Sequence, residues 1–221
     1  MSESPRSPRL MKGALIAVDP ANPLASVVLF QYNPDTLTRS ITPNMSGGGS
    51  GGQSQGEALR LLGPPEETIT VDVEIDATDQ LESAQPQALA LGIHPALAAL
   101  EMLVYPKSAV VIASEVLAAV GMIEVVPPEA PLTIFVWGPA RVVPVRVSSV
   151  SITEEAFDTA LNPIRAHANL TLRVLNYRDL GLASAGGALF MAHQIVKETM
   201  ATMNGVAALS GSISISAGIG G

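Results

Sequence analysis

The sequence predicts a mainly β protein with a C-terminal helical extension. The clearest evidence is the segment "EETITVDVEIDA", where apolar and polar residues alternate as they do along a half-buried strand. Further along, two strand-like segments flank a tight corner at Gly138-Pro139. After Leu180 the apolar residues change to a helical spacing, which predicts a helix beyond the strands.

The first strands are predicted near the N-terminus. Residues 1–9 read as a disordered arm, and "LMKGALIAV" and "SVVLFQY" predict two strands separated by the turn-rich "DPANPLA". The second strand ends at the corner "FQYNPDTL", which contains Asn33 and Pro34. Proline fixes φ and asparagine can close its own backbone turn, so this corner is predicted to be a turn. The Gly/Ser-rich residues 44–57 then predict a flexible loop, and no Gly-Lys-Ser/Thr follows to make it a phosphate-binding loop.

The alternating strand predicts one apolar and one acidic face. Its apolar residues are Ile69, Val71, Val73 and Ile75, and the opposite row is Thr70, Asp72, Glu74 and Asp76. Carboxylates two positions apart repel one another unless a cation lies opposite them, and no group of ligands elsewhere completes a metal site. A solvated or subunit-facing row is therefore the favoured interpretation, and a cation site is the alternative.

The middle of the chain predicts one helix and leaves another segment open. "GIHPALAALEMLVYP" predicts a short helix, whereas "KSAVVIASEVLAAVGMIEVVPPEA" fits either a strand–turn–strand or a helix. Pro144 lies inside the strand after the Gly138-Pro139 corner and predicts an edge strand or a bulge. A hairpin arm is predicted next, and it ends in a strand with Leu170, Leu172 and Val174 on one face.

The C-terminal segment, residues 180–221, predicts a helix followed by a distinct tail. The helical spacing is carried by Leu189, Ala192, Val196, Met200 and Met203, and Gly205 is interpreted as its stop or as a kink. In the closing "SGSISISAGIGG", Ile213, Ile215 and Ile219 alternate with serine and glycine. This pattern fits a strand-like tail that completes the sheet of another chain, and it fits simple disorder equally well.

Composition excludes several classes of function. A formal charge of −8 argues against a nucleic-acid or anionic-membrane surface, because both demand a basic face. There is no cysteine, and the three histidines are scattered, so thiolate chemistry is excluded and a histidine-based metal site is not expected. Only 14% of the residues are charged and 48% are hydrophobic, which indicates either a large core or a surface buried against other subunits. The polar opening "MSESPRSPRLMKG" shows no signal peptide, so synthesis in the cytoplasm is expected.

No constellation of catalytic residues is recognised. Matches to Gly-x-Ser-x-Gly and Gly-x-Gly-x-x-Gly fall only within the Gly/Ser-rich residues 44–57, where no helix pattern begins, so neither a nucleophile elbow nor a Rossmann fingerprint is recognised. The carboxylate pairs Glu66-Glu67 and Glu154-Glu155 are interpreted as solvated strand ends, and Trp137 as a core or subunit-contact anchor, because the chain is only 4% aromatic. We therefore expect neither an enzyme nor a cofactor.

Five segments, taken in their order along the chain, resemble the tube-like proteins of contractile injection systems, the phage-tail-like machines related to tailocins and type VI secretion. These segments are "FQYNPDTL", "ETITVDVEID", "HPALAALEMLV", "PLTIFVWGPARVVPVRVSSVSITEEAF" and "NPIRAHANLTLRVL", within residues 10–178. The chain is most similar to the tube-initiator, or inner-baseplate, proteins. Many of those end in a peptidoglycan-binding LysM module, but no LysM-like sequence follows Asp179 here, so peptidoglycan binding is not implied.

The resemblance implies a phage-tail-tube/Hcp-like β-barrel over residues 10–179, made of two packed antiparallel sheets with one flanking helix. Residues from about 105 to 128 would be an insertion and residues 180–221 an extension. Six copies would form a ring around a channel, between the spike hub and the inner tube of an assembled particle that is retained or released. The acidic row would face the channel or a basic patch on the next ring. The expected structural or interface residues are Phe30, Asn33, Pro34, Asp72, Glu74, Asp76, Trp137, Gly138, Ile213 and Ile215.

Three alternatives stay open. The first is a stand-alone β-sandwich module that binds a cell-surface ligand as a monomer. The second is a hydrolase whose site the sequence hides. The third, within the same family, is a plain tube protomer, against which the insertion and the C-terminal extension argue because a tube repeat is usually compact.

Overall fold

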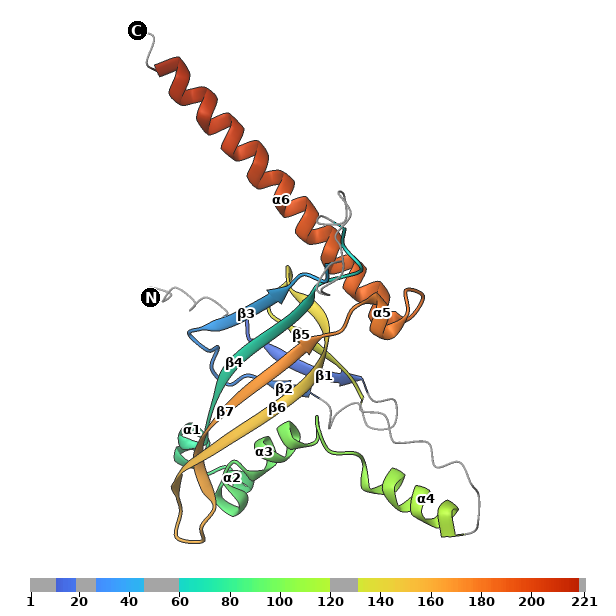
Figure 1. The fold of residues 1–221 in the computed structure, drawn as a ribbon. Helices are drawn as coiled ribbons and strands as arrows, with labels where there is room; N and C mark the ends of the chain where they lie inside the picture. The colour runs from blue at the N-terminus through green and yellow to red at the C-terminus, as the bar shows by residue number, and fades with distance from the viewer. Residues whose placement is uncertain (1–10, 19–26, 46–59, 120–130, 219–221) are drawn as a thin grey trace, which may run out of the picture.

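The computed structural model describes residues 11–18, 27–45, 60–119 and 131–218, and the side chains of these up to residue 209. Its strands form one seven-stranded antiparallel sheet in the order β2-β1-β5-β6-β7-β4-β3 (Figure 1). The strands are β1 (Ala14–Val18), β2 (Val27–Leu29), β3 (Leu37–Thr42), β4 (Glu66–Asp76), β5 (Leu132–Val136), β6 (Val142–Phe157) and β7 (Pro163–Val174). The fold is therefore mixed α/β rather than mainly β.

The predicted barrel of two packed sheets is wrong for the described part of the chain. All seven strands belong to a single sheet, and β2 and β3, at its two ends, each pair with one neighbour only. A barrel requires the first and last strands to pair with each other, and these two do not. The β-sandwich of the alternative interpretation needs two sheets and is not seen either.

Within the described ranges, six helices accompany the sheet. They are α1 (Thr78–Glu82), α2 (Pro86–Leu91), α3 (His94–Glu101), α4 (Ser108–Ala119), α5 (Tyr177–Leu180) and α6 (Ala185–Gly218). Helix α3 is the one predicted from "HPALAALEMLV". Helix α4 resolves the open segment after Tyr105 as a helix as far as Ala119, and the remainder of that segment lies outside the described residues. The predicted arm at residues 1–9 and most of the Gly/Ser-rich loop lie outside them too.

The sheet has one apolar and one polar face. The predicted alternation in β4 is confirmed, because Ile69, Val71, Val73 and Ile75 are all buried. On the same face, Leu170 and Leu172 of β7 join them, and Leu97 and Leu100 of α3 pack against this layer. The burial of these side chains is the main source of folding free energy, at roughly 1.5–3 kcal/mol for each large apolar group.

The hairpin predicted after Pro144 is formed by β6 and β7, but Pro144 does not lie in an edge strand. Strand β6 pairs with β5 on one side and with β7 on the other. The carbonyl of Pro144 accepts a hydrogen bond from the Leu175 amide, at 2.9 Å, just beyond the end of β7. The nitrogen and oxygen of a strand residue point to the same side of the strand. The position where Pro144 lacks an N–H therefore faces Leu175, just beyond the last paired residue of β7. The register irregularity in β6 lies further on, between Val147 and Ser149.

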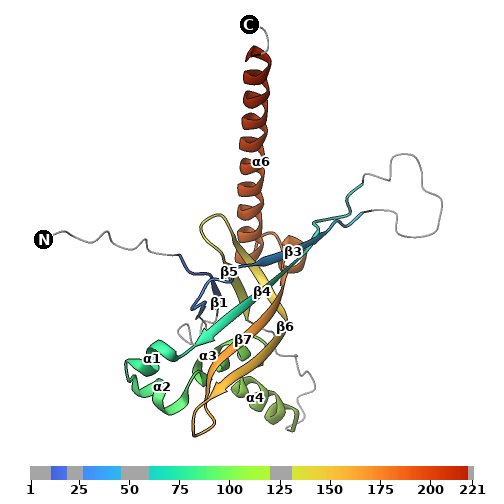
Figure 2. The same cartoon turned by 90° about the vertical axis from the view of Figure 1, so that its left-hand side faces the viewer.

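Helix α6 is anchored at its start and then leaves the body of the protein (Figures 1 and 2). Phe190 belongs to the core, whereas every side chain described from Glu198 to Leu209 is exposed. Gly205 does not stop the helix, since α6 continues to Gly218. The predicted strand-like tail is therefore wrong for residues 210–218, which are helical.

Candidate assembly interface

The corner after β2 is built by two amide side chains. The Asn33 side chain accepts a hydrogen bond from the Gly13 amide at 2.9 Å and donates one to the Met11 carbonyl at 2.8 Å. The Gln31 side chain donates a hydrogen bond to the Asp76 carbonyl at 2.6 Å and accepts one from the Asp76 amide at 3.0 Å. Asn33 thus ties the corner to the segment before β1, whereas the sequence predicted that it closes a turn of its own backbone. Pro34 follows it as a half-buried residue that fixes the chain direction.

Three aromatic rings lie directly behind this corner. Phe30 and Phe135 are fully buried, and Trp137 is stacked on Phe135 with ring centroids 5.9 Å apart. Trp137 also lies 6.3 Å from Phe30. A Cβ atom on Gly13 would come within 2.7 Å of both the Phe30 and the Trp137 rings, so only glycine fits there. Trp137 therefore packs on the core, as one of its two predicted roles required, and its neighbours there are Phe30 and Phe135.

Gly138 makes the turn between β5 and β6. Its φ is +74°, a conformation that favours glycine, and the Trp137 amide donates to the Arg141 carbonyl at 2.7 Å across the turn. The Gly138-Pro139 corner predicted from the sequence is confirmed, and it fixes where the long β6 strand begins.

The acidic row of β4 lies on the polar face but is not uniformly solvated. Asp72 is exposed, whereas Asp76 is only 7% exposed. The Asp76 carboxylate forms an ion pair with the guanidinium of Arg165 on β7 at 2.7 Å. It also accepts hydrogen bonds from the Thr78 amide, at 2.6 Å, and from the Thr78 hydroxyl. Arg165 also lies 3.8 Å from Glu74. Burial tends to raise the pKa of Asp76, but the hydrogen bonds from Thr78 and Arg165 outweigh it and leave the pKa below 3.8.

A second charged cluster lies on the apolar face, where β4 begins. Glu67 is only 6% exposed and binds Arg39 of β3 at 2.6 Å and Lys197 of α6 at 3.0 Å. Burial raises the pKa of Glu67, and the hydrogen bonds from Lys197 and Arg39 more than reverse this, so the pKa lies below 4.5. The interpretation of Glu66-Glu67 as a solvated pair is wrong for Glu67, because its side chain shares a face with Ile69 under α6.

A pocket of about 410 Å³ opens beside this cluster, between α6 and the segment that leads into β4. Its walls are mostly apolar and include Leu61, Pro64, Tyr177 and Phe190, while His193 and Lys197 supply polar groups. His193, which lines the pocket, is only 7% exposed. Burial and the nearby Lys197 lower the pKa of His193 below 6.5, so the ring is neutral at pH 7.

Large apolar side chains are exposed on both protruding helices. On α4 these are Val110, Val111, Ile112, Val116 and Leu117, and on α6 they are Ile195, Val196, Met200, Met203, Val206 and Leu209. Ile213 and Ile215, predicted as interface residues of a strand, lie in the helical continuation of α6. Scattered exposed apolar residues are ordinary, but contiguous ones mark surfaces that contact another molecule.

The structure leaves the ten predicted residues in three separate places. Phe30, Asn33, Pro34, Trp137 and Gly138 gather at the aromatic corner, Asp72, Glu74 and Asp76 line the polar face, and Ile213 and Ile215 lie far out on α6. In the described part of the chain, no group of three or more histidine or acidic residues could hold a metal ion. Over the same residues, no helix is long and apolar enough to cross a membrane.

Sequence reasoning missed Arg165, Lys197, His193 and Gln31. The alternation of "RAHANLTLR" could have placed Arg165 on the polar face, opposite Asp76. The spacing of His193 and Lys197, one helical turn apart, could have placed both on one side of α6. Nothing local points to Gln31.

Compared with known proteins, the sequence matches no protein-family model and no curated protein.

Proposed function

We propose that this protein is a structural subunit of a contractile injection system, a tube-initiating adaptor of the baseplate whose six copies form a ring between the spike hub and the inner tube. The observation that carries the proposal is the single open sheet, with two strands unpaired on one side and a polar face along its middle strands. The five segments that resemble tube-like proteins form the corner after β2, strands β4 to β7 and helix α3.

The two edge strands are suited to joining neighbours. In the described part of the chain, β2 and β3 present unpaired backbone groups at opposite edges of the same sheet. Edge strands left open in this way are templates for pairing with another chain. If β3 of one copy meets β2 of the next, the contact is heterologous, and such contacts close into a ring when the rotation allows.

The polar face is suited to line a channel. Along β4, β6 and β7 it carries Thr70, Asp72, Ser151, Asn169 and Thr171, all of them exposed or half-buried. The core helix α3 and the anchored part of α6 contact the opposite face. In a ring of six copies the polar face would point to the water-filled centre, while helices would face outward. The role is templating, with no chemical step.

Helix α6 is suited to grip a neighbouring baseplate component. Its anchored part ends near Lys197, and the side chains described from Glu198 to Leu209 are exposed. Most helix stability in proteins comes from packing of an apolar face, so the exposed apolar side chains of this part would gain stability from a partner.

Electron microscopy of particles purified from cells that make a tagged full-length chain tests the proposal. We expect the tag on one six-fold layer between spike and tube. Recovery of the chain only as a free monomer, in cells that assemble the particles, would contradict it.

Charge reversal tests the channel-facing role of the polar face. Asp72→Lys, at an exposed position, should disturb assembly or the passage of cargo, while Glu101→Lys, exposed on α3, is the control. Unchanged assembly and ejection in the Asp72 variant would remove the channel from the proposal.

Truncation tests the gripping role of α6. A chain that ends at Glu198 retains the anchored part, and normal particles from it would argue against that role.

A further inference from the structure

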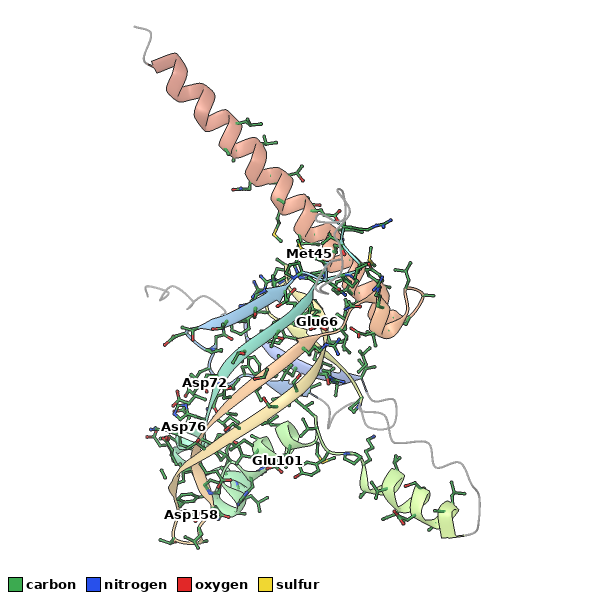
Figure 3. The ribbon with its side chains drawn as sticks, in the orientation of Figure 1. Met45, Glu66, Asp72, Asp76, Glu101 and Asp158 are labelled. Carbon is green, nitrogen blue, oxygen red and sulfur yellow. The ribbon has the colours of Figure 1, made fainter. Side chains whose placement is uncertain are left out.

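The two ends of the sheet carry opposite charge. Where β4 begins, the basic side chains are Arg39, Arg141, Arg146, Arg173, Arg178 and Lys197. They outnumber the acidic side chains at that end, which are Glu66, Glu67, Asp179 and Glu198. Where β4 finishes, the reverse holds among the described residues, because Arg165 is the one lysine or arginine beside Glu74, Asp76, Asp79, Glu154, Glu155 and Asp158. Figure 3 shows Glu66 at one end and Asp76 and Asp158 at the other.

The acidic end also presents a preformed apolar tip. Phe157 and Leu161, in the turn of the β6–β7 hairpin, are 51% and 78% exposed. The Asp158 carboxylate accepts hydrogen bonds from the Ala160 and Asn162 amides, at 2.7 and 2.8 Å, which hold the turn in one shape. Leu161 has φ +64°, a conformation unusual for a residue other than glycine. The turn thus holds a leucine in an unfavourable backbone conformation with its side chain in water.

The basic end presents a matching hollow. The 410 Å³ pocket between α6 and the start of β4 has a size typical of sites that take a ligand, about 300–1,000 Å³. Its apolar walls end at His193, which is more than nine-tenths buried, and at Lys197. Lys197 and Arg39 leave positive charge in excess beside Glu67. The hollow is therefore suited to apolar side chains followed by a carboxylate.

From these three features we propose that copies of this chain associate head to tail, with the β6–β7 tip of one copy seated in the pocket of the next. Phe157 and Leu161 would lie against Phe190 and Tyr177. Glu154 and Glu155 would approach the basic side chains around the pocket. A tip cannot reach the pocket of its own chain, because the two lie at opposite ends of the sheet (Figure 3).

This contact goes beyond the proposed function and does not depend on it. A ring formed through the sheet edges needs no contact along the strand direction, and a head-to-tail pair needs no ring. Because the contact is heterologous, one copy can bind two others, and the association can extend in a line. Attraction between the charged ends would fall as salt is raised, because salt screens interactions between exposed charges.

Cysteine cross-linking of the full chain provides the test, since the natural sequence has no cysteine. Leu161→Cys and Gln194→Cys would be made separately, given different tags, mixed and oxidised. Leu161 is at the tip, and Gln194 lines the pocket. We expect the mixed dimer to be the main cross-linked product and to decline as salt is raised. Thr199→Cys, exposed further along α6, is the matched control and should form little mixed dimer with Leu161→Cys.

A second measurement keeps the proposal falsifiable if oxidation is slow. Sedimentation at rising concentration should show association of the wild-type chain, and association should be lost in the Phe157→Ser/Leu161→Ser variant, whose changes are at exposed positions. Equal mixed dimer from the Gln194 and Thr199 variants would overturn the proposal. So would association that is unchanged by the tip substitutions, and so would a wild-type chain that stays monomeric.

Discussion

Lys197 on α6 binds the carboxylate of Glu67 on β4 at 3.0 Å, across 130 positions of the sequence. Arg39 of β3 binds the other side of the same carboxylate. One buried acidic group therefore connects the edge strand, an inner strand and the C-terminal helix. The geometry makes Glu67 the residue on which the docking of α6 depends.

Replacing Glu67 tests this dependence. Glu67→Gln removes the negative charge and leaves two cations close together, so we expect a loss of about 1–3 kcal/mol in the free energy of unfolding. Urea denaturation measures it. Glu66→Gln is the matched control, because the Glu66 side chain is 70% exposed and its change should have little effect. Equal losses in the two variants would contradict the role of Glu67.

The stability of the protein should fall with acid in two stages. The pKa of His193 lies below its ordinary 6.5, so the fold favours the neutral ring, and stability is lost as the pH drops below 6.5 through the lower folded value. The pKa of Glu67 lies below 4.5, so its contribution is complete above 4.5 and lost as the pH falls through its folded value. The charged groups facing His193 are Lys197, Glu67, Arg39 and Arg141.

Thermal unfolding followed against pH checks the first stage. In His193→Gln the decline just below pH 6.5 should shrink relative to the wild type. A decline that persists unchanged in the His193 variant would assign it to another group.

Asn33 should contribute through both of its hydrogen bonds. Asn33→Ala loses the pairs with Gly13 and Met11, and we expect a cost of about 1–3 kcal/mol. Asn33→Asp retains an acceptor for the Gly13 amide but has no donor for the Met11 carbonyl, so its loss should be smaller. Hydrogen exchange of the Gly13 amide gives the local readout. Asp35→Ala, next to the corner and exposed, should leave that exchange unchanged.

Two glycines should respond to alanine with opposite signs. Gly138→Ala places a side chain at φ +74°, and we expect a loss of about 1 kcal/mol. Gly205 lies inside α6 with nothing within 4 Å of an added Cβ, so Gly205→Ala should raise helix stability by up to about 1 kcal/mol. Circular dichroism and urea denaturation distinguish the two. A stabilising Gly138→Ala would show that the turn does not need its left-handed backbone.

Local patterns predicted the elements whose periodicity is complete within the element. The alternation from Ile69 to Ile75 placed β4 and its buried face correctly, and "HPALAALEMLV" predicted α3. Helices α1 and α2 were missed because five or six residues are too few to establish a period. The tail was misread because Ile213 and Ile215 alternate with serine, a pattern typical of strands that here continues a helix.

Contacts between distant segments were beyond the sequence. Glu67 is preceded by another glutamate and by two prolines, so its surroundings suggested solvent. Its burial depends on Lys197 and Arg39, which no local pattern relates to it. Closure of the sheet was equally unpredictable, because it is decided by whether β2 and β3 meet.

From Thr199 to its last residue the chain contains no Asp, Glu, Lys, Arg or His. The part of α6 beyond Glu198 therefore presents no ionisable side chain, so neither pH nor ionic strength can act through charge on its side of the proposed contact. The charged ends of the sheet behave in the opposite way. Salt should release contacts at the sheet ends, and mild detergent should release those on α6. If the proposed contacts form, raising the salt and adding mild detergent would therefore break them separately.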